Sequence, residues 1–141
     1  MENKLLDSTN EKILSILAEN ARASYSAIAQ EVALSAPAVK ERMRRLEDAG
    51  IITGYRAEVD QQRLGNPIGA FILVAVPYSQ EKAFVRFVKE TEAVGSCHHL
   101  LGDSAFILQV RLESMEALET LLSMCMRFGQ TTTHMLLSKV K

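Results

Sequence analysis

The sequence predicts an α+β protein in two parts, a helical N-terminal third followed by a longer part of mixed strands and helices. Two observations predict this fold class. Within residues 1–50, apolar side chains recur at helical spacing behind three potential capping residues. In residues 68–141, a strand–helix–strand pattern occurs twice in succession. Residues 61–67 hold a glycine and a proline and form the best candidate linker, so we expect domains at 1–60 and 68–141.

The composition is that of a folded protein outside the membrane. Hydrophobic residues make up 48% of the chain and charged residues 23%, which is typical of a folded domain and excludes a disordered one. The longest apolar run, residues 68–76, is far shorter than the roughly 20 residues of a membrane helix. Cys97 and Cys125 are too few and too far apart for a disulfide framework or a zinc site. We therefore expect a cytoplasmic protein with reduced thiols.

The first two expected helices each begin at a side chain that can cap a helix. Ser8, followed three residues later by Glu11, forms a capping-box pattern, and this first helix should fade near Asn20. Ser24 can cap a second, shorter helix. Both helices carry an apolar stripe, made of Ile13, Ile16 and Leu17 in the first and Ile28, Ala29 and Val32 in the second.

The third expected helix has a sequence signal at both ends. Ser35 caps its start, and Pro37 lies in the first turn, where a missing N–H is harmless. Gly50 is the expected left-handed stop. Its buried stripe consists of Val39, Met43 and Leu46.

A short helix, a turn of about three residues and a longer helix form a helix-turn-helix unit, whose second helix enters the major groove of DNA. The net charge of −1 gives no overall attraction to DNA, but four basic residues lie between Lys40 and Arg45. Such a run is usually a solvated helix face, and the capped helices around it favour DNA binding here. The expected DNA-binding residues are Ser24, Ser35, Ala36, Pro37, Ala38, Lys40, Glu41, Arg42, Arg44, Arg45 and Arg56.

Residues 51–60 are interpreted as a short ribbon with a break at Gly54. This ribbon would be the wing of a winged helix-turn-helix, with Arg56 near the DNA backbone.

The C-terminal pattern predicts a split β-α-β-β-α-β unit, which is the ferredoxin-like arrangement. The expected elements are a strand at 68–76, a helix at 79–91, strands at 94–101 and 105–112, a helix after Ser114 and a strand at 131–138. The last helix should bury Met115, Leu118, Leu122 and Cys125. Two helices cover one sheet face. The run at 68–76 is apolar on both sides, so we expect a second copy to stack on the other face as a sandwich.

Short motifs run through nearly the whole chain in a fixed order. They are Leu6-Asp7 through Ile13-Leu14, Asn20-Ala21-Arg22, Leu34-Ser35 through Val39, Arg42 with Arg45-Leu46-Glu47, Gly50-Ile51-Ile52 with Gly54-Tyr55, Leu64-Gly65, Gly102-Asp103 and the threonine-rich last strand. No single motif is specific, but together they resemble the feast/famine, or Lrp/AsnC, family of transcriptional regulators.

The resemblance implies a transcriptional regulator that forms DNA-binding dimers, often assembled into octamers, and that binds an amino-acid effector between dimers. The positions that match the effector site are Gly102, Asp103, Ser104, Ala105, Thr131, Thr132 and Thr133. Family members commonly carry Asp where this chain has Ala105 and where it has Asn10. The loss of a carboxylate at Ala105 implies altered effector selectivity. The threonines also suit a strand without any ligand.

Other functions find less support in the residues. His98 and His99 are adjacent in a strand, point to opposite faces and cannot easily bind one metal ion, so no metal site is expected. The sequence has no glycine-rich phosphate loop, and no cofactor is expected. The alternative function is a ferredoxin-like enzyme or metabolite-binding module with a helical appendage. This alternative does not account for the small residues at the start of the third helix or for the basic residues that follow them.

Overall fold

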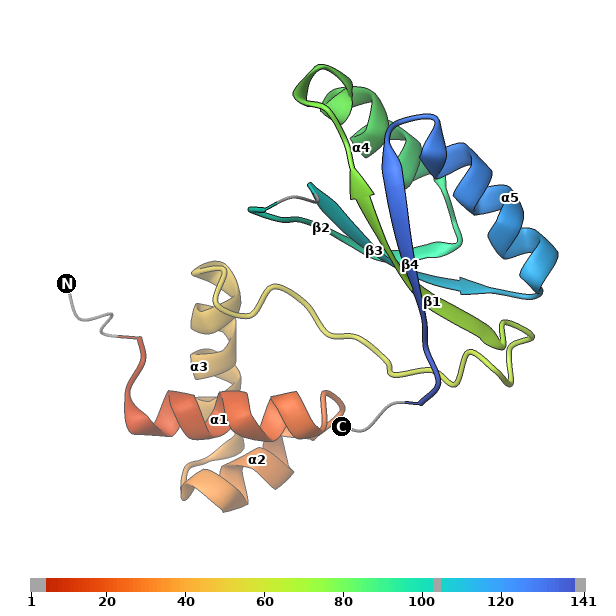
Figure 1. The fold of residues 1–141 in the computed structure, drawn as a ribbon. Coiled ribbons are helices and arrows are strands. Elements are labelled where there is room, and N and C mark those ends of the chain that lie inside the picture. The colour runs from red at the N-terminus through yellow and green to blue at the C-terminus, as the bar shows by residue number, and fades with distance from the viewer. Residues whose placement is uncertain (1–4, 103–104, 139–141) are drawn as a thin grey trace. The chain divides into compact units, whose positions relative to one another are not determined.

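The computed structural model describes residues 5–102 and 105–138, and the chain forms two compact units that divide between Glu58 and Val59 (Figure 1). The first unit is helical and the second is an α/β unit. None of the described helices is long and apolar enough to cross a membrane.

The first unit consists of three helices, α1 (Ser8–Glu19), α2 (Tyr25–Val32) and α3 (Ala36–Asp48). Each helix turns one apolar stripe inward, as the spacing of the sequence predicts. The buried residues of this small core are Ile13, Leu17, Ile28, Ala29, Val39 and Met43. Lys12 on α1 also donates a hydrogen bond to the carbonyl of Glu31 near the end of α2, which fastens these two helices together.

The predicted caps are confirmed for two helices and wrong for one. Ser24 and Ser35 accept hydrogen bonds from the backbone N–H groups of Ala27 and Ala38, at 3.1 and 3.3 Å. The cap of α1 is Asp7, whose carboxylate accepts from the backbone N–H of Asn10 at 2.8 Å. Ser8, the predicted cap, is the first helical residue. Two neighbouring side chains can both cap a helix, and here the charged one does.

The helix ends of this unit use two left-handed residues, one of them unusual. Gly50 has a φ of +69° and stops α3 as predicted, and the N–H of Ile51 then donates to the carbonyl of Leu46. Ala33 has a φ of +52° at the end of α2, where the N–H of Leu34 donates to the carbonyl of Ala29. The turn between α2 and α3 therefore depends on an alanine in a conformation that favours glycine.

The predicted ribbon at 51–60 is not formed within the chain. None of these residues belongs to a strand, and the segment from 53 to 60 is exposed. A ribbon needs two paired strands, and this stretch supplies only one extended segment without a partner for its backbone.

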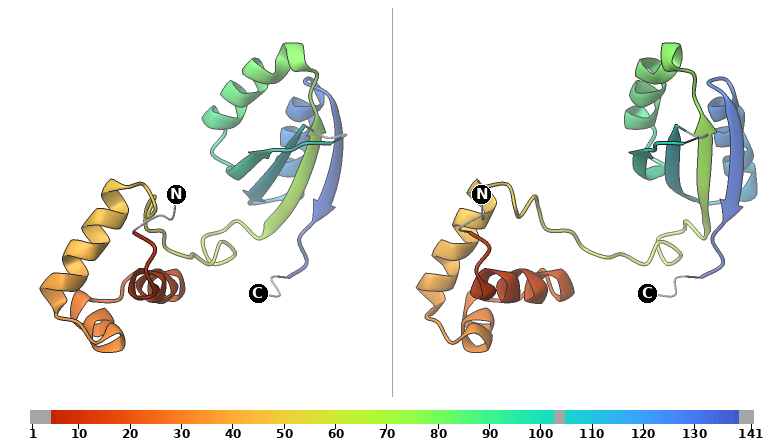
Figure 2. Two further views of the ribbon diagram at one scale, coloured as in Figure 1. Left: turned by 90° about the vertical axis from the view of Figure 1, so that its left-hand side faces the viewer. Right: turned by 60° about the vertical axis from the view of Figure 1, so that its left-hand side comes forward.

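The second unit is a four-stranded antiparallel sheet with two helices on one face, and this confirms the predicted fold class (Figures 1 and 2). The strand order is β2-β3-β1-β4, so β2 and β4 are the edges. The strands are β1 (Ile68–Ala75), β2 (Val94–His99), β3 (Phe106–Leu112) and β4 (Gln130–Met135). The helices are η1 (Tyr78–Gln80), a single 3-10 turn, followed by α4 (Glu81–Glu90) and α5 (Met115–Met126).

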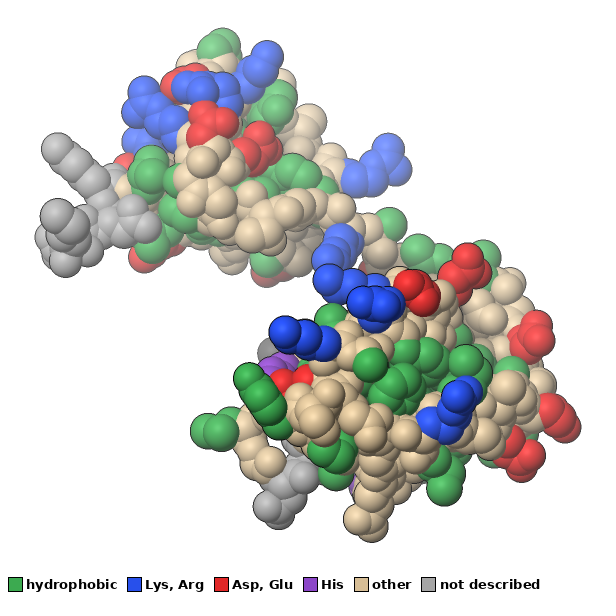
Figure 3. All heavy atoms as spheres, turned by 90° about the horizontal axis from the view of Figure 1, so that it is seen from above, with side chains coloured by type: hydrophobic (Ala, Val, Ile, Leu, Met, Phe, Trp, Pro, Cys, Tyr) green, Lys and Arg blue, Asp and Glu red, His purple; other side chains and the backbone are tan. Residues whose placement is uncertain are grey.

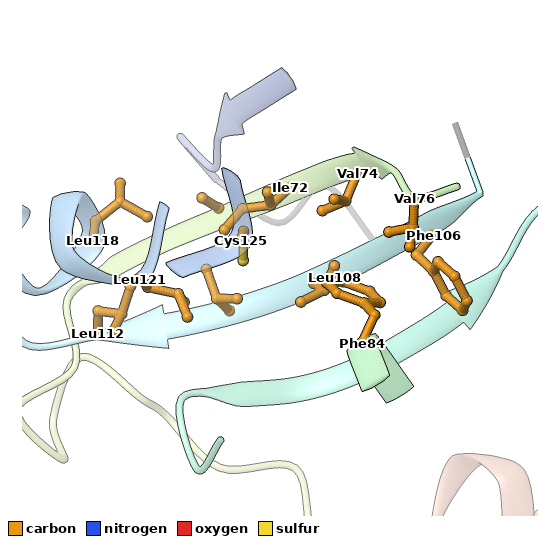
Figure 4. Close-up of a cluster of buried hydrophobic side chains, with 12 residues drawn as sticks. Ile72, Val74, Val76, Phe84, Phe106, Leu108, Leu112, Leu118, Leu121 and Cys125 are labelled. Carbon is orange, nitrogen blue, oxygen red and sulfur yellow. The ribbon is translucent and has the colours of Figure 1, made fainter. Parts of the chain in front are cut away.

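The core of the second unit lies between the sheet and its helices. Phe84 of α4 stacks in tilted contact with Phe106 at 5.0 Å and meets the edge of Phe128 at 5.3 Å. Figure 4 shows Phe84 and Phe106 at one end of this cluster and α5 side chains at the other. The predicted stripe of α5 is partly wrong, because Met115 is 47% exposed and Leu121 is buried instead. Met115 is the first residue of the helix and has no preceding turn to bury it.

Among the described residues of the second unit, no helix covers the other sheet face. We call it the open face, defined by alternate residues of paired strands: Phe71, Leu73 and Ala75 of β1, Ile107, Gln109 and Arg111 of β3, Ser96 and His98 of β2, and Gln130, Thr132 and His134 of β4. The apolar residues of β1 on this face are only half-buried. Within the described residues of the second unit, β1 is thus covered by helices on one side only, although its apolar run is typical of a strand that is covered on both sides.

Candidate nucleic-acid interface and effector site

The exposed side of α3 carries a carboxylate held between two arginines. Nε and Nη2 of Arg44 donate to Glu41 at 3.0 and 2.9 Å, and Nε of Arg45 donates to the same carboxylate at 3.0 Å. Nη1 of Arg44 also donates to Asp48 at 2.5 Å. These hydrogen bonds from Arg44 and Arg45 lower the pKa of Glu41 to about 2, so its carboxylate is ionised at neutral pH. Figure 3 shows basic and acidic side chains intermixed on the N-terminal unit.

The first turn of α3 is small and accessible. Pro37 is exposed, while Ala36 and Ala38 are half-buried and present little bulk. Ser35 uses its hydroxyl oxygen as the cap acceptor, which leaves its O–H free to donate. Lys40 is exposed on the following turn. These residues form an accessible helix N-terminus with a cation beside it.

Arg42 differs from the other arginines because it is attached to α1. Its Nη1 donates to Oδ2 of Asp7 at 2.7 Å and to Oδ1 of Asn10 at 3.0 Å. Asn10 is 3% exposed and donates from its own amide to the carbonyl of Leu5 at 2.7 Å. The hydrogen bond from Arg42 holds the pKa of Asp7 below its usual range. The Arg42 side chain, which is 32% exposed, is therefore held against α1 through Nη1, and its contact with DNA stays a prediction.

Sequence spacing alone does not predict this network of Arg42, Asp7 and Asn10. Asp7 and Asn10 lie more than 30 residues from Arg42, and no local pattern joins positions so far apart. The available signal was a polar residue, Asn10, three positions before the apolar stripe that begins at Ile13, on the inward face of α1.

Tyr55 links the segment after α3 back to the helix. Its hydroxyl donates to a carboxylate oxygen of Glu47 at 2.7 Å. Partial desolvation of this side chain, which is 46% exposed, and the hydrogen bond to Glu47 raise the pKa of Tyr55 to about 12. Arg56, the next residue, is exposed in the extended segment. Neither Tyr55 nor Glu47 was among the predicted site residues.

The predicted effector residues of β4 are divided between the two sheet faces. Thr131 and Thr133 lie opposite Val74 and Ile72, which face the helices. Thr132 lies opposite Leu73 on the open face. Since opposite residues of an antiparallel pair share a face, the three hydroxyls do not converge on one ligand from one side of the strand.

The turn between β2 and β3 lies at the same end of the sheet as the start of β4, but at the other edge. Gly102 has a φ of +146°, and the N–H of Leu100 donates to the carbonyl of Ala105 at 2.7 Å. Asp103 and Ser104 lie outside the described residues. The two edges of a four-stranded sheet are about 14 Å apart. A single chain therefore does not bring Gly102 and the threonines to one small molecule.

One cavity was not anticipated by the sequence. A hollow of about 550 Å³ lies between α4 and the edge strand β2, and none of the predicted effector residues lines it. Its apolar walls are Val85, Val88, Val94 and Phe106, with Cys97 and His99 beside them. Burial raises the pKa of the Cys97 thiol, which keeps it protonated and unreactive at neutral pH.

The two adjacent histidines point to opposite faces, as predicted. His98 pairs with Ile107 on the open face, whereas the ring of His99 stacks on Phe106 at 4.6 Å. Among residues 5–102 and 105–138, no group of three potential ligand side chains could hold a metal ion.

A capped helix-turn-helix followed along the chain by an antiparallel α/β unit is the domain composition of a class of DNA-binding regulators, and the comparisons with known proteins identify the family. Residues 6–53 match the model for winged helix-turn-helix DNA-binding domains, and residues 69–141 match the Lrp/AsnC ligand binding domain. The chain belongs to the Lrp/AsnC family and is a DNA-binding transcriptional regulator, not an enzyme.

Relatives and solved structures resemble the chain over almost its full length. The transcriptional regulator LrpC of Bacillus subtilis is 30% identical over 96% of this chain and 94% of its own length, and LrpA of Mycobacterium tuberculosis is 34% identical over 85% and 81%. The structure of B. subtilis LrpC matches with a TM-score of 0.89 at 30% identity, covering 96% and 97% of the two chains. The M. tuberculosis feast or famine regulatory protein, complexed with L-methionine, matches with a TM-score of 0.88 at 30% identity, covering 96% and 95%.

Proposed function

We propose that the chain is an amino-acid-responsive regulator that binds DNA as a homodimer in the cytoplasm. In this proposal residues 1–60 bind DNA, residues 61–67 link the domains, and residues 68–141 dimerise and sense the effector. The observation that carries the proposal is the exposed side of α3, where a small first turn is followed by Lys40, Arg44 and Arg45.

The DNA contacts that we propose follow from the chemistry of α3 and its neighbours. The first turn, Ala36 to Ala38, is small enough to approach base edges in the major groove. Ser24 and Ser35 begin α2 and α3, where hydroxyl and N–H donors suit phosphate oxygens. Lys40, Arg44, Arg45 and Arg56 supply cations for the backbone. Arg42 is proposed as a positioning residue that holds α3 against α1.

The open face is the proposed dimer interface. Its centre is apolar at Phe71, Leu73 and Ile107, and these residues are half-buried in one chain. A second copy stacked on this face removes them from water, which favours association by about 25 cal/mol per Å² of apolar surface. Assembly of such dimers into an octamer is the arrangement that we propose for the larger particle.

The effector that we propose is an α-amino acid with an apolar side chain. The likeness to a regulator complexed with L-methionine supports this ligand class. We propose that the site forms between copies, where the turn of one chain (Gly102, Asp103, Ser104 and Ala105) meets Thr131, Thr132 or Thr133 of another. A glycine turn leaves N–H groups that suit a carboxylate, and threonine hydroxyls suit either end of the amino acid.

The experiment that tests the proposed function is selection of bound sequences from random duplex DNA by the full chain, with and without amino acids. A two-fold dimer should select a pseudo-palindrome with half-sites about 10 base pairs apart, or a multiple of that spacing. Enrichment of no sequence would contradict sequence-specific binding. Selected sequences without dyad symmetry would contradict the dimer.

A further inference from the structure

The two arginines beside Glu41 differ in the donors that remain to them. Arg44 uses all three of its side-chain nitrogens, donating to Glu41 and Asp48. Arg45 donates only from Nε, to Oε1 of Glu41 at 3.0 Å. Within the part of the chain that the structure describes, Nη1 and Nη2 of Arg45 have no protein acceptor. Arg44 is thus neutralised by two carboxylates, and Arg45 keeps a terminal pair of donor groups.

The hydrogen bond to Glu41 gives that terminal pair a direction. An arginine side chain has four rotatable bonds and ordinarily loses entropy when a ligand fixes it. Here Nε is already tied to the helix one turn earlier, and the Arg45 side chain, which is 62% exposed, extends outward. Two parallel N–H donors on a fixed guanidinium match two acceptors lying side by side, which the guanine edge presents as N7 and O6.

The position of the pair on α3 suits the major groove. Ala38, Glu41 and Arg45 are three and four residues apart, and they therefore lie in one row on the helix surface. Ala38 is small, so the row can approach a base edge closely at its start. Glu41 adds a negative charge within the same row, and this charge repels the phosphates of any duplex.

We infer that Glu41 is a specificity-determining residue that orients the Arg45 guanidinium toward a guanine edge and weakens binding to DNA of any other sequence. The inference rests on the proposed location of α3 in the major groove. An oriented arginine favours one sequence, and the negative charge of Glu41 offsets part of the positive charge of Arg44 and Arg45 against every duplex, so the two effects together increase discrimination.

The test compares Glu41→Gln with Asp48→Asn in the full chain. Both substitutions remove one negative charge from α3, but only the first alters the partner of Arg45. Dissociation constants are measured at a fixed salt concentration, about 100 mM KCl, for a duplex selected by the wild-type protein and for a mixed-sequence duplex of equal length. The mixed-sequence duplex reports binding that depends on charge alone.

We expect Asp48→Asn to strengthen binding to both duplexes by the same factor. Glu41→Gln should strengthen binding to the mixed duplex and weaken binding to the selected one, so that discrimination falls about tenfold, as for one lost bidentate base contact. Replacing the guanines of the selected duplex by 7-deazaguanine should weaken its binding to the wild-type protein and leave its binding to Glu41→Gln unchanged. Equal factors for both duplexes with Glu41→Gln would overturn the inference.

A failure of the proposed function gives a different result. If Lys40→Ala and Arg45→Ala both leave the two affinities unchanged, α3 does not contact DNA at all, and the inference falls with the proposal. If these variants weaken binding while Glu41→Gln behaves like Asp48→Asn, α3 contacts DNA and only the role of Glu41 is wrong.

Discussion

Nη1 of Arg42 lies 2.7 Å from Oδ2 of Asp7, so the residue that caps the first helix is ion-paired to the middle of the third. The same nitrogen donates to Asn10, a buried side chain whose carbonyl oxygen has Arg42 as its donor. The geometry of α3 relative to α1 therefore depends on polar contacts as well as on the apolar core.

Removal of the Arg42 side chain should lower the stability of the folded protein, whether or not DNA is present. Arg42→Ala leaves the buried oxygen of Asn10 without a donor, and this loss should reduce the free energy of unfolding by about 1–3 kcal/mol. Thermal and urea unfolding followed by circular dichroism measure it. Lys40→Ala is the matched control, since Lys40 is exposed on the same helix. Equal stability of Arg42→Ala and wild type would contradict a positioning role.

Replacement of Ala33 by glycine should stabilise the turn between α2 and α3. Alanine at a φ of +52° carries about 1–2 kcal/mol of strain, and glycine avoids this strain but loses more backbone entropy on folding. The expected net gain is about 0.5–1 kcal/mol in urea unfolding. Ala33→Val should destabilise the protein instead, because a β-branched residue tolerates this conformation poorly. A loss of stability in Ala33→Gly would contradict the assigned backbone strain.

A charge on the open face should prevent self-association. Phe71→Asp puts a carboxylate at the centre of the proposed interface, where burial without a partner is strongly unfavourable. Analytical ultracentrifugation should show a smaller particle, and affinity for a two-half-site operator should fall. Tyr78→Asp is the control, since Tyr78 is an aromatic residue that is 88% exposed and lies outside that face. If both variants sediment like the wild type, the open face is not the interface.

The phenol of Tyr55 should ionise late. Partial desolvation and the hydrogen bond to Glu47 raise its pKa to about 12, so the folded state binds this proton more tightly than the unfolded state does. The resulting stabilisation is present below pH 10 and is lost as the pH rises toward 12. Spectrophotometric titration of the three tyrosines should give one delayed step that is missing in Tyr55→Phe. A wild-type titration curve without a delayed step would contradict the Glu47 contact.

The effector site should depend on the backbone of Gly102. Isothermal titration calorimetry against the twenty amino acids should detect an apolar ligand such as leucine or methionine, because Ala105 supplies no carboxylate for a charged one. Gly102→Val forces a β-branched residue toward a φ of +146° and should abolish binding by distorting the turn. Binding that survives in Gly102→Val would move the site elsewhere, and the hollow between α4 and β2 would then be the next location to examine.

Local chemistry in the sequence determined most of the secondary structure. Ser24 and Ser35 could be identified as caps and Gly50 as a stop because each acts through hydrogen bonds or backbone angles within four residues of itself. The strands of the second unit could be identified because apolar residues crowd or alternate along them. Local signals failed where two neighbouring side chains could both cap a helix, as at Asp7 and Ser8. They also failed where an extended segment has no strand to pair with, as at 51–60.

Only the tertiary structure decided what the functional side chains do. The run from Lys40 to Arg45 looks uniform in sequence, yet folding assigns Arg42 to Asp7, Arg44 to two carboxylates and Arg45 to one. Strand order likewise separates the predicted effector residues. Gly102 follows the edge strand β2 and the threonines lie in the edge strand β4, and β3 and β1 lie between these two strands. Sequence spacing carries the period of a helix or strand, but contacts between distant segments depend on how whole elements pack, and no short pattern encodes that.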